Sequence, residues 1–320
     1  MDRRVAAAPA PEARAATGLW AAFGAYVLWG AFPLYFPLLE PAGALEILAH
    51  RVFWTAVTCL AVLLVMRRPL PWRGLSRRQA GVLAAAAVAN GTNWGVYIAA
   101  VNTGHVVEAA LGYFINPLVS VLLGVVVLHE RLRRAQAAAV AVAGAGVLVL
   151  TAAYGSVPWI ALVLGLSFGT YGLLKKQAAV EPLPGLAVES LVLAPLAVAL
   201  LAGIELTGRG SLSAGAEHDV LLATTGLVTA APLLLFGMAA LRVPLSVMGL
   251  LQYVTPTLQL GIGVLVRHEP MTRTRWAGFG LVWASLAVFA SDQVRAYRAR
   301  RAGAPLPERG EGLLVADRDG

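Results

Sequence analysis

Ionisable side chains lie inside segments of this sequence that are apolar enough to cross a membrane. The segment ALEILAHRVFW, residues 44–54, carries Glu46, His50 and Arg51, and a later apolar segment carries Glu108. On a helix Glu46 and His50 share one face, whereas Arg51 points about 100° away from His50. Ionisable groups at membrane depth are costly and are usually functional or paired. We therefore predict an ion pair between Arg51 and Glu108, and a proton-coupling or substrate-binding role for Glu46 and His50.

Two simpler interpretations of these groups stay open at the level of the sequence. Glu46 lies less than one turn from the expected membrane boundary, which also suits a plain interfacial residue. Arg51 and Glu108 also suit a structural clamp that touches no substrate.

Neutral polar side chains recur at helical spacing in other apolar segments. Asn90, Asn93 and Tyr97 would share one helix face. At 1.5 Å per residue from the expected boundaries, Asn116 lies at a depth of about 16 Å and Gln252 at about 12 Å. The substrate site of a carrier is expected at this depth, although interhelical hydrogen bonds explain the asparagines equally well. The predicted cavity lining is Asn90, Asn93, Trp94, Tyr97, Tyr113, Asn116, Tyr171, Gln252 and Tyr253.

Two prolines lie next to the predicted midplane amides. Pro117 follows Asn116 directly, and Pro256 comes four residues after Gln252. A proline lacks the N–H group that bonds the carbonyl four residues earlier, so each one weakens the helix at that point. We predict a helix break at Pro117 and at Pro256, beside the substrate site.

The composition identifies the solvent of the chain as a lipid bilayer. Of its 320 residues 58% are hydrophobic and 13% are charged, whereas a soluble domain is nearer half apolar and a quarter charged. The net charge of +8 does not indicate nucleic-acid binding, because Lys and Arg lie between apolar segments rather than on one basic face. A single cysteine and the absence of zinc-ligand, P-loop and serine-hydrolase motifs argue against a metal site, a cofactor and catalysis.

Ten segments are long and apolar enough to span the roughly 30 Å hydrocarbon core, which requires about 17 to 25 residues. The chain is thus expected to be an all-α polytopic membrane protein with ten transmembrane helices. The expected spans are residues 18–36, 44–66, 80–101, 105–127, 136–152, 158–174, 186–206, 218–240, 244–266 and 275–291.

The distribution of basic residues predicts the orientation. With the N-terminus inside, 20 of the 25 Lys and Arg residues fall on the inner side and four on the outer side. Basic residues resist translocation, so both termini are expected in the cytoplasm. The loop RHEPMTRTR, residues 267–275, is basic on the outer side and is the exception. Residues 1–17 form a cytoplasmic segment, and the composition of residues 292–320 predicts a disordered cytoplasmic tail.

The two halves of the chain contain a repeat. NPLVSVLLGVVVLHE (116–130) aligns with TPTLQLGIGVLVRHE (255–269) at a constant offset of 139 residues, which matches Pro117 with Pro256. The repeating unit is therefore five helices, residues 18–152 and 158–291. A unit with an odd number of spans must enter the membrane from the opposite side the second time, which predicts an inverted repeat of the kind found in secondary transporters.

The sequence resembles a known family. The motif NPLVSVLLGVVVLHERL is similar to the EamA family of the drug/metabolite transporter superfamily. GAYVLWGAFPLYF, ALEILAHRVFW, NWGVYIAAVNTGHVVEAALGYFINPLVSVLLG and LQYVTPTLQL resemble its RarD subgroup. The resemblance covers about residues 18–291 and implies a multi-pass carrier of the bacterial cytoplasmic membrane, often called chloramphenicol-sensitive by association.

These patterns predict a secondary transporter that moves a small organic metabolite or drug by alternating access without ATP, with possible proton coupling. A membrane-embedded enzyme and a channel-like scaffold are the alternatives. The sequence leaves the substrate, the direction of transport and the oligomeric state open.

Overall fold

The computed structural model describes residues 11–69, 72–102, 106–154, 158–212, 214–266 and 273–301, and every regular element in these residues is a helix. The all-α prediction is confirmed for this part of the chain. The elements are α1 (Pro11–Gly30), α2 (Phe32–Tyr35), the 3-10 helix η1 (Phe36–Leu39), α3 (Ala44–Val65), α4 (Arg77–Asn102), α5 (Val106–Val126), α6 (Arg134–Tyr154), α7 (Trp159–Ala178), α8 (Pro182–Leu206), α9 (Ala216–Ala240), α10 (Leu245–Leu251), α11 (Val254–Leu265) and α12 (Arg273–Arg301).

Each of the ten predicted apolar segments coincides with one helix or with consecutive helices. Leu196 and Leu206 on α8 are largely exposed, which suits a surface that faces lipid. Within the described residues, four helical stretches are long and apolar enough to cross a membrane: Ala15–Leu39, Ala44–Val65, Pro182–Leu206 and Ala216–Ala240.

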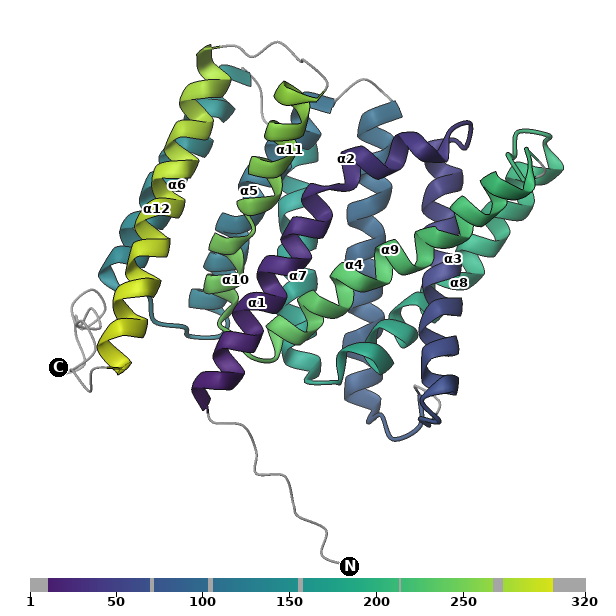
Figure 1. Ribbon diagram of the computed structural model, residues 1–320, viewed down its shortest axis with the longest axis horizontal. Coiled ribbons are helices and arrows are strands. Elements are labelled where there is room, and N and C mark those ends of the chain that lie inside the picture. The colour runs from purple at the N-terminus through teal and green to yellow at the C-terminus, as the bar shows by residue number, and fades with distance from the viewer. Residues whose placement is uncertain are drawn as a thin grey trace, which may run out of the picture.

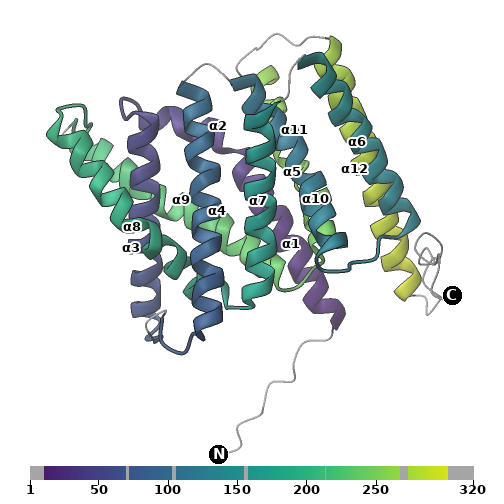
Figure 2. The ribbon, with the colours of Figure 1, turned by 180° about the vertical axis from the view of Figure 1, so that it is seen from behind.

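The long helices form one bundle in which successive passes alternate in direction (Figure 1). The start of α1 and the end of α12 lie at the same end of the bundle, the lower end in Figure 1, which we call the terminal end. We call the other end the opposite end. The pair α6 and α12 forms one edge, and α3 with α8 lies at the other edge, as the reverse view in Figure 2 also shows.

Contacts between the two halves form a regular set. The pairs α3–α8, α5–α10 and α6–α12 each join helices that occupy equivalent places in the two halves. The other contacts form matching couples: α4–α7 with α1–α9, α5–α7 with α1–α11, and α3–α9 with α4–α8. If each helix is replaced by its equivalent in the other half, one contact of a couple becomes the second contact of that couple.

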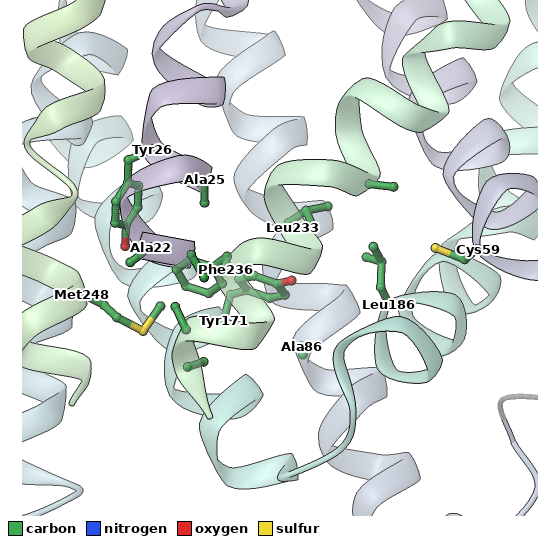
Figure 3. Packing of buried hydrophobic residues seen from close by; sticks show 14 of the residues in the cluster. Ala22, Ala25, Tyr26, Cys59, Ala86, Tyr171, Leu186, Leu233, Phe236 and Met248 are labelled. Atoms are coloured by element: carbon green, nitrogen blue, oxygen red, sulfur yellow. The ribbon is translucent and has the colours of Figure 1, made fainter. Parts of the chain in front are cut away.

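Close helix crossings and an aromatic cluster hold the centre. A Cβ atom on Gly226 of α9 would lie 2.3 Å from the Trp54 carbonyl oxygen of α3, so glycine is needed where these helices cross. In the core shown in Figure 3, Tyr26 of α1 packs edge-on against Phe236 of α9, and Tyr171 of α7 stacks on Phe236 with ring centres 5.7 Å apart. The cluster therefore joins helices of both halves.

The last helix is longer than the sequence suggests. α12 continues through residues 292–301, which we assigned to a disordered tail. Asp292 pairs with Arg133, just before α6, with Nη2 and Oδ2 2.6 Å apart. This ion pair ties the extension of α12 to the start of α6, which composition alone does not reveal.

Candidate functional site

Two buried amides lie on α5 and in the turn between α10 and α11. Oδ1 of Asn116 faces α7, where a Cβ atom on Gly165 would lie 3.5 Å from it. Asn116 of α5 is 4% exposed, and Gln252, in the turn between α10 and α11, is 6% exposed. Neither side-chain carbonyl oxygen has a hydrogen-bond partner within the described residues. A buried acceptor without a partner costs about 1–3 kcal/mol, which a ligand that donates to it would recover. The two amides are therefore suited to hold a polar solute.

The backbone beside the amides differs between the two halves. The chain turns between α10 and α11 just before Pro256, whereas α5 runs without interruption through Pro117. A Cβ atom on Gly249 of α10 would lie 2.6 Å from the Pro117 carbonyl oxygen, so the two backbones touch. Tyr253 also donates its hydroxyl to the Phe114 carbonyl oxygen at 3.2 Å. The helix break predicted at Pro117 is therefore wrong, whereas the chain does break just before Pro256, and α5 packs closely against α10 at its proline.

Arg51 of α3 lies among aromatic rings. Its guanidinium carbon is 4.7 Å from the ring centre of Trp94, 5.5 Å from that of Phe32 and 5.6 Å from that of Phe36. Its Nε donates to the Thr229 hydroxyl at 3.0 Å. Aromatic faces stabilise a guanidinium, whose planar fork also matches a carboxylate or phosphate. The Arg51 region therefore suits a planar or anionic group of a solute.

The ion pair predicted between Arg51 and Glu108 falls outside the described side chains, because Glu108 is described only as part of the α5 backbone. The pair stays a prediction. Two other predicted lining residues do meet: the rings of Tyr97 on α4 and Tyr113 on α5 pack edge to face with centres 6.0 Å apart. The aromatic surface therefore continues from α4 onto α5.

Glu46 and His50 lie at the opposite end, near the start of α3. Glu46 accepts the Ser211 backbone N–H at 2.7 Å and the Ser211 hydroxyl at 2.8 Å. The hydroxyl oxygen is also 2.9 Å from Nε2 of His218. Because serine gives its one hydroxyl hydrogen to Glu46, the imidazole is the donor in this contact. We call Glu46, Ser211 and His218 the opposite-end clamp; His50 is buried, and neither ring nitrogen has a partner among the described residues.

The two predicted asparagines on α4 have different surroundings. Asn93 donates from Nδ2 to the Leu164 carbonyl oxygen at 2.9 Å and to the Ser167 hydroxyl at 3.1 Å, which links α4 to α7. Asn90 is buried and lines a small cavity together with Trp94. The predicted lining residues thus fall into three groups: the amides Asn116 and Gln252, the aromatic surroundings of Arg51, and the Asn90 cavity. Trp94 belongs to both of the last two groups.

Sequence reasoning missed a buried ion pair. The Nζ of Lys175, on α7, is 2.7 Å from Oε1 of Glu189, on α8, and the two side chains are 5% and 4% exposed. Tyr171, predicted to line a cavity, donates its hydroxyl to Oε2 of Glu189 at 3.2 Å. The sequence placed Lys175 just beyond one span and Glu189 near the end of the next. Both helices extend past the predicted boundaries, so both groups lie within the bundle.

Sequence reasoning also missed the role of Glu130, which follows α5 at the terminal end. Its carboxylate accepts the backbone N–H groups of Leu245 at 2.8 Å and Ser246 at 2.9 Å, and the Ser246 hydroxyl at 2.8 Å. The Nζ of Lys176 lies 3.4 Å from Oε1. We call Glu130, Lys176, Leu245 and Ser246 the terminal-end clamp. The 139-residue repeat contains Glu130 and was the signal that could have singled it out.

Comparison with known proteins places this architecture in a family. Residues 16–152 match the EamA-like transporter family. Protein RarD of Streptomyces exfoliatus is 53% identical over 289 residues, covering 89% of this chain and 92% of the relative. The uncharacterized transporter YojE of Bacillus subtilis is 43% identical over 284 residues, covering 86% and 94%.

A solved structure has a similar fold. A protein crystal structure 18% identical in sequence superimposes with a TM-score of 0.68 and covers 90% of this chain and 99% of that chain. The family resemblance expected from the sequence motifs is confirmed by the relatives. With several apolar helices and relatives named as transporters, the chain is a multi-pass membrane protein. It belongs to the EamA-like transporter family, in the RarD subgroup of the drug/metabolite transporter superfamily.

Proposed function

We propose that the protein is a secondary carrier that moves a small organic metabolite or drug across the bacterial cytoplasmic membrane by alternating access, coupled to protons. In this proposal the two halves are inverted five-helix repeats and both termini are cytoplasmic. The observation that carries it is the regular set of contacts between the halves, in which each contact has a counterpart on exchange of the halves. Two like units that rock about their contact can expose one site to either side in turn.

The substrate site in this proposal lies beside α5, where this helix packs against α7 and α10. Asn116 and Gln252 support it, because each brings a buried acceptor to the contact between the halves. Their neutral amides favour a polar or weakly charged solute over a bare ion. Arg51 and Trp94 would add a planar or anionic subsite on the side of α3 and α4.

Alternating access also requires contacts that open in turn at the two ends. The terminal-end clamp joins Glu130 of the first half to Ser246 of the second, and the opposite-end clamp joins Glu46 to Ser211. Each clamp bridges the halves at one end, so each is a candidate for the contact that breaks when that end opens.

Transport by the purified protein tests this function. Labelled metabolites and antibiotics, chloramphenicol among them, are offered to proteoliposomes with and without a pH gradient. We expect one solute class whose uptake saturates and is accelerated by unlabelled solute on the far side. Flux that does not saturate or exchange would identify a channel-like protein instead.

Variants locate the site in the same assay. Replacing Asn116 or Gln252 by alanine should lower uptake by about tenfold, because each lost hydrogen bond to the solute is worth roughly 1.4 kcal/mol. Ser291→Ala is the matched control, since this exposed hydroxyl bonds only within α12, to the Val288 carbonyl oxygen, among the described contacts. Unchanged uptake in both amide variants would exclude Asn116 and Gln252 as the substrate site.

A further inference from the structure

The buried ion pair of Lys175 and Glu189 is not explained by stability. Its two charges lie 2.7 Å apart and are almost completely buried. Each ionisable group within a membrane helix is costly to insert. Replacing a buried pair by apolar residues is often neutral or stabilising. The pair therefore points to a function that needs a charge at this place.

The helices leave room for the lysine. A Cβ atom on Gly185 of α8 would lie 3.3 Å from Nζ of Lys175, and one on Gly237 of α9 would lie 3.6 Å from Cε. Two glycines on different helices thus border the Lys175 side chain along its length. The ammonium is held against the Glu189 carboxylate by the shape of the site as well as by charge.

A small, mainly apolar cavity is lined in part by Glu189. It has a volume of about 10 Å³, enough for the centre of one water molecule. Its polar walls come from Glu189, Ser190, Asn90 and Thr55. Asn90 is 5% exposed, and its Oδ1 has no hydrogen-bond partner among the described residues. The unpaired Asn90 oxygen therefore gives this cavity one free acceptor beside Glu189, at a place from which a proton can reach the carboxylate inside the bundle.

The cavity is connected to the Arg51 region by a shared side chain. Trp94 lines the cavity and also lies under the Arg51 guanidinium. Only Trp94 therefore separates the cavity beside Glu189 from the proposed planar or anionic subsite.

The titratable groups that face Glu189 come from two helices. Lys175 and Tyr171 of α7 contact it directly, and the buried Cys59 of α3 lies within electrostatic range. The cavity residues from α4 and α9 are neutral, with Asn90 the polar one. Lys175 is therefore the cation whose counter-charge disappears when Glu189 is protonated.

We propose that Glu189 binds the coupling proton of the carrier, an inference that rests on the proposed transport function. A proton carried by hydronium from the aqueous side adds to a carboxylate oxygen of Glu189, leaving water behind, and converts the carboxylate to a neutral carboxylic acid. Lys175 keeps its ammonium and loses its counter-charge. Because Lys175 is in the last turn of α7, it can then move toward water at the terminal end.

That movement acts directly on the terminal-end clamp. Lys176, the next residue, donates to the Val243 carbonyl oxygen at 2.7 Å and lies 3.4 Å from Oε1 of Glu130. A shift in the last turn of α7 lengthens both contacts of Lys176. Protonation of Glu189 therefore favours opening of the terminal end, and deprotonation favours its closure.

Infrared difference spectroscopy of the full-length protein in liposomes tests the proton site without any solute. On acidification the wild type should show the carbonyl band of one newly protonated buried carboxyl group. Glu189→Gln should abolish this band, whereas the matched control Glu46→Gln should retain it. Lys175→Met should keep Glu189 protonated across the pH range, so that the band no longer depends on pH.

Retention of the titrating band in Glu189→Gln, or its loss in Glu46→Gln, would overturn the assignment. Thermal unfolding shows whether each variant is folded. If Glu189→Gln does not fold, Lys175→Met/Glu189→Leu replaces the whole pair by apolar groups and should fold without the titrating band. A band that persists in the folded double variant would also overturn the proposal.

Transport separates this inference from the proposed function. In Glu189→Gln, solute exchange without a pH gradient should persist, while acceleration by the gradient is lost. Gradient-driven transport that survives Glu189→Gln would overturn the proton site and leave the carrier function standing. A wild type with the titrating band and no saturable flux for any solute would support the proton site while contradicting the carrier function.

Discussion

The two ends of the bundle hold the halves together through similar hydrogen bonds but different surroundings. At the terminal end, Glu130 accepts the N–H and the hydroxyl of Ser246, and Lys176 stands beside the carboxylate. At the opposite end, Glu46 accepts the same two groups from Ser211, and an imidazole stands behind the serine. Both glutamates come from the first half and both serines from the second. At the terminal end a cation therefore flanks the carboxylate. At the opposite end one serine hydroxyl connects the carboxylate to the imidazole.

The largest effect is expected at the terminal end. Glu130→Ala removes the acceptor for two backbone N–H groups and one hydroxyl, and leaves Lys176 without its carboxylate. We expect a loss of about 3–4 kcal/mol in the free energy of unfolding, since three hydrogen bonds are lost and the net contribution of each is about 0.5–1.5 kcal/mol. Unfolding of the protein in lipid nanodiscs measures it.

A second carboxylate at the terminal end provides the control for Glu130. Glu181 pairs with Arg68 at the surface, with side chains 65% and 43% exposed. Glu181→Ala should therefore cost less than about 1 kcal/mol. Equal losses in Glu130→Ala and Glu181→Ala would show that the terminal-end clamp does not hold the halves.

The matching change at the opposite end should cost less. Glu46→Ala leaves the N–H and hydroxyl of Ser211 without their acceptor but strands no cation. We expect a loss of about 2–3 kcal/mol in the same measurement, and a smaller one for Glu46→Gln, which keeps an acceptor oxygen. Glu217→Ala in the exposed first turn of α9 is the control and should cost less than about 1 kcal/mol. A larger loss for Glu46→Ala than for Glu130→Ala would reverse the order of the two ends.

The sequence predicts the helices far better than it predicts these clamps. Apolar segments of about 20 residues are a local property of the chain, and all ten coincide with helices. The burial of Asn116 and Gln252 also follows from local spacing, because Asn116 shares a helix face with Gly112 and Ser120, and Gln252 shares one with Thr255. Such patterns need no knowledge of which helices touch.

Contacts between distant residues are not local, and the sequence gives few signs of them. Glu46 meets Ser211 across 165 positions, and Glu130 meets Ser246 across 116. Lys175 and Glu189 are 14 positions apart, but their contact depends on where α7 ends and α8 begins. Span boundaries read from hydropathy are uncertain by a few residues, which was enough to leave Lys175 just outside its predicted span and Glu189 near the end of the next one.

A third prediction tests the packing that surrounds the terminal-end clamp. A Cβ atom on Gly124 would lie 2.7 Å from Oε2 of Glu130 and 3.1 Å from the Ser246 nitrogen. Gly124→Ala should therefore displace the carboxylate and cost about 2 kcal/mol through overpacking. Gly144→Ala on α6, where no heavy atom lies within 4 Å, should be neutral or should stabilise the helix by up to about 1 kcal/mol. The idea of a tightly fitted clamp is wrong if both alanines behave alike.

The smallest effects separate the two serines. Ser246→Ala removes one of three donors to Glu130, while the two backbone N–H groups and Lys176 remain, so we expect a loss of about 0.5 kcal/mol. Ser211→Ala removes a donor to Glu46 and also the acceptor for His218, so we expect a loss of about 1 kcal/mol or more.

A double-mutant cycle of Ser211→Ala with His218→Ala should then give a coupling energy of about 0.5–1 kcal/mol, because the two residues share a contact. The corresponding cycle of Ser246→Ala with Lys176→Met should give a smaller coupling, since Lys176 faces the carboxylate rather than the serine. Equal coupling energies at the two ends would mean that the contact between Ser211 and His218 does not stabilise the opposite-end clamp. The two clamps would then be held in the same way, by the hydrogen bonds to their glutamates.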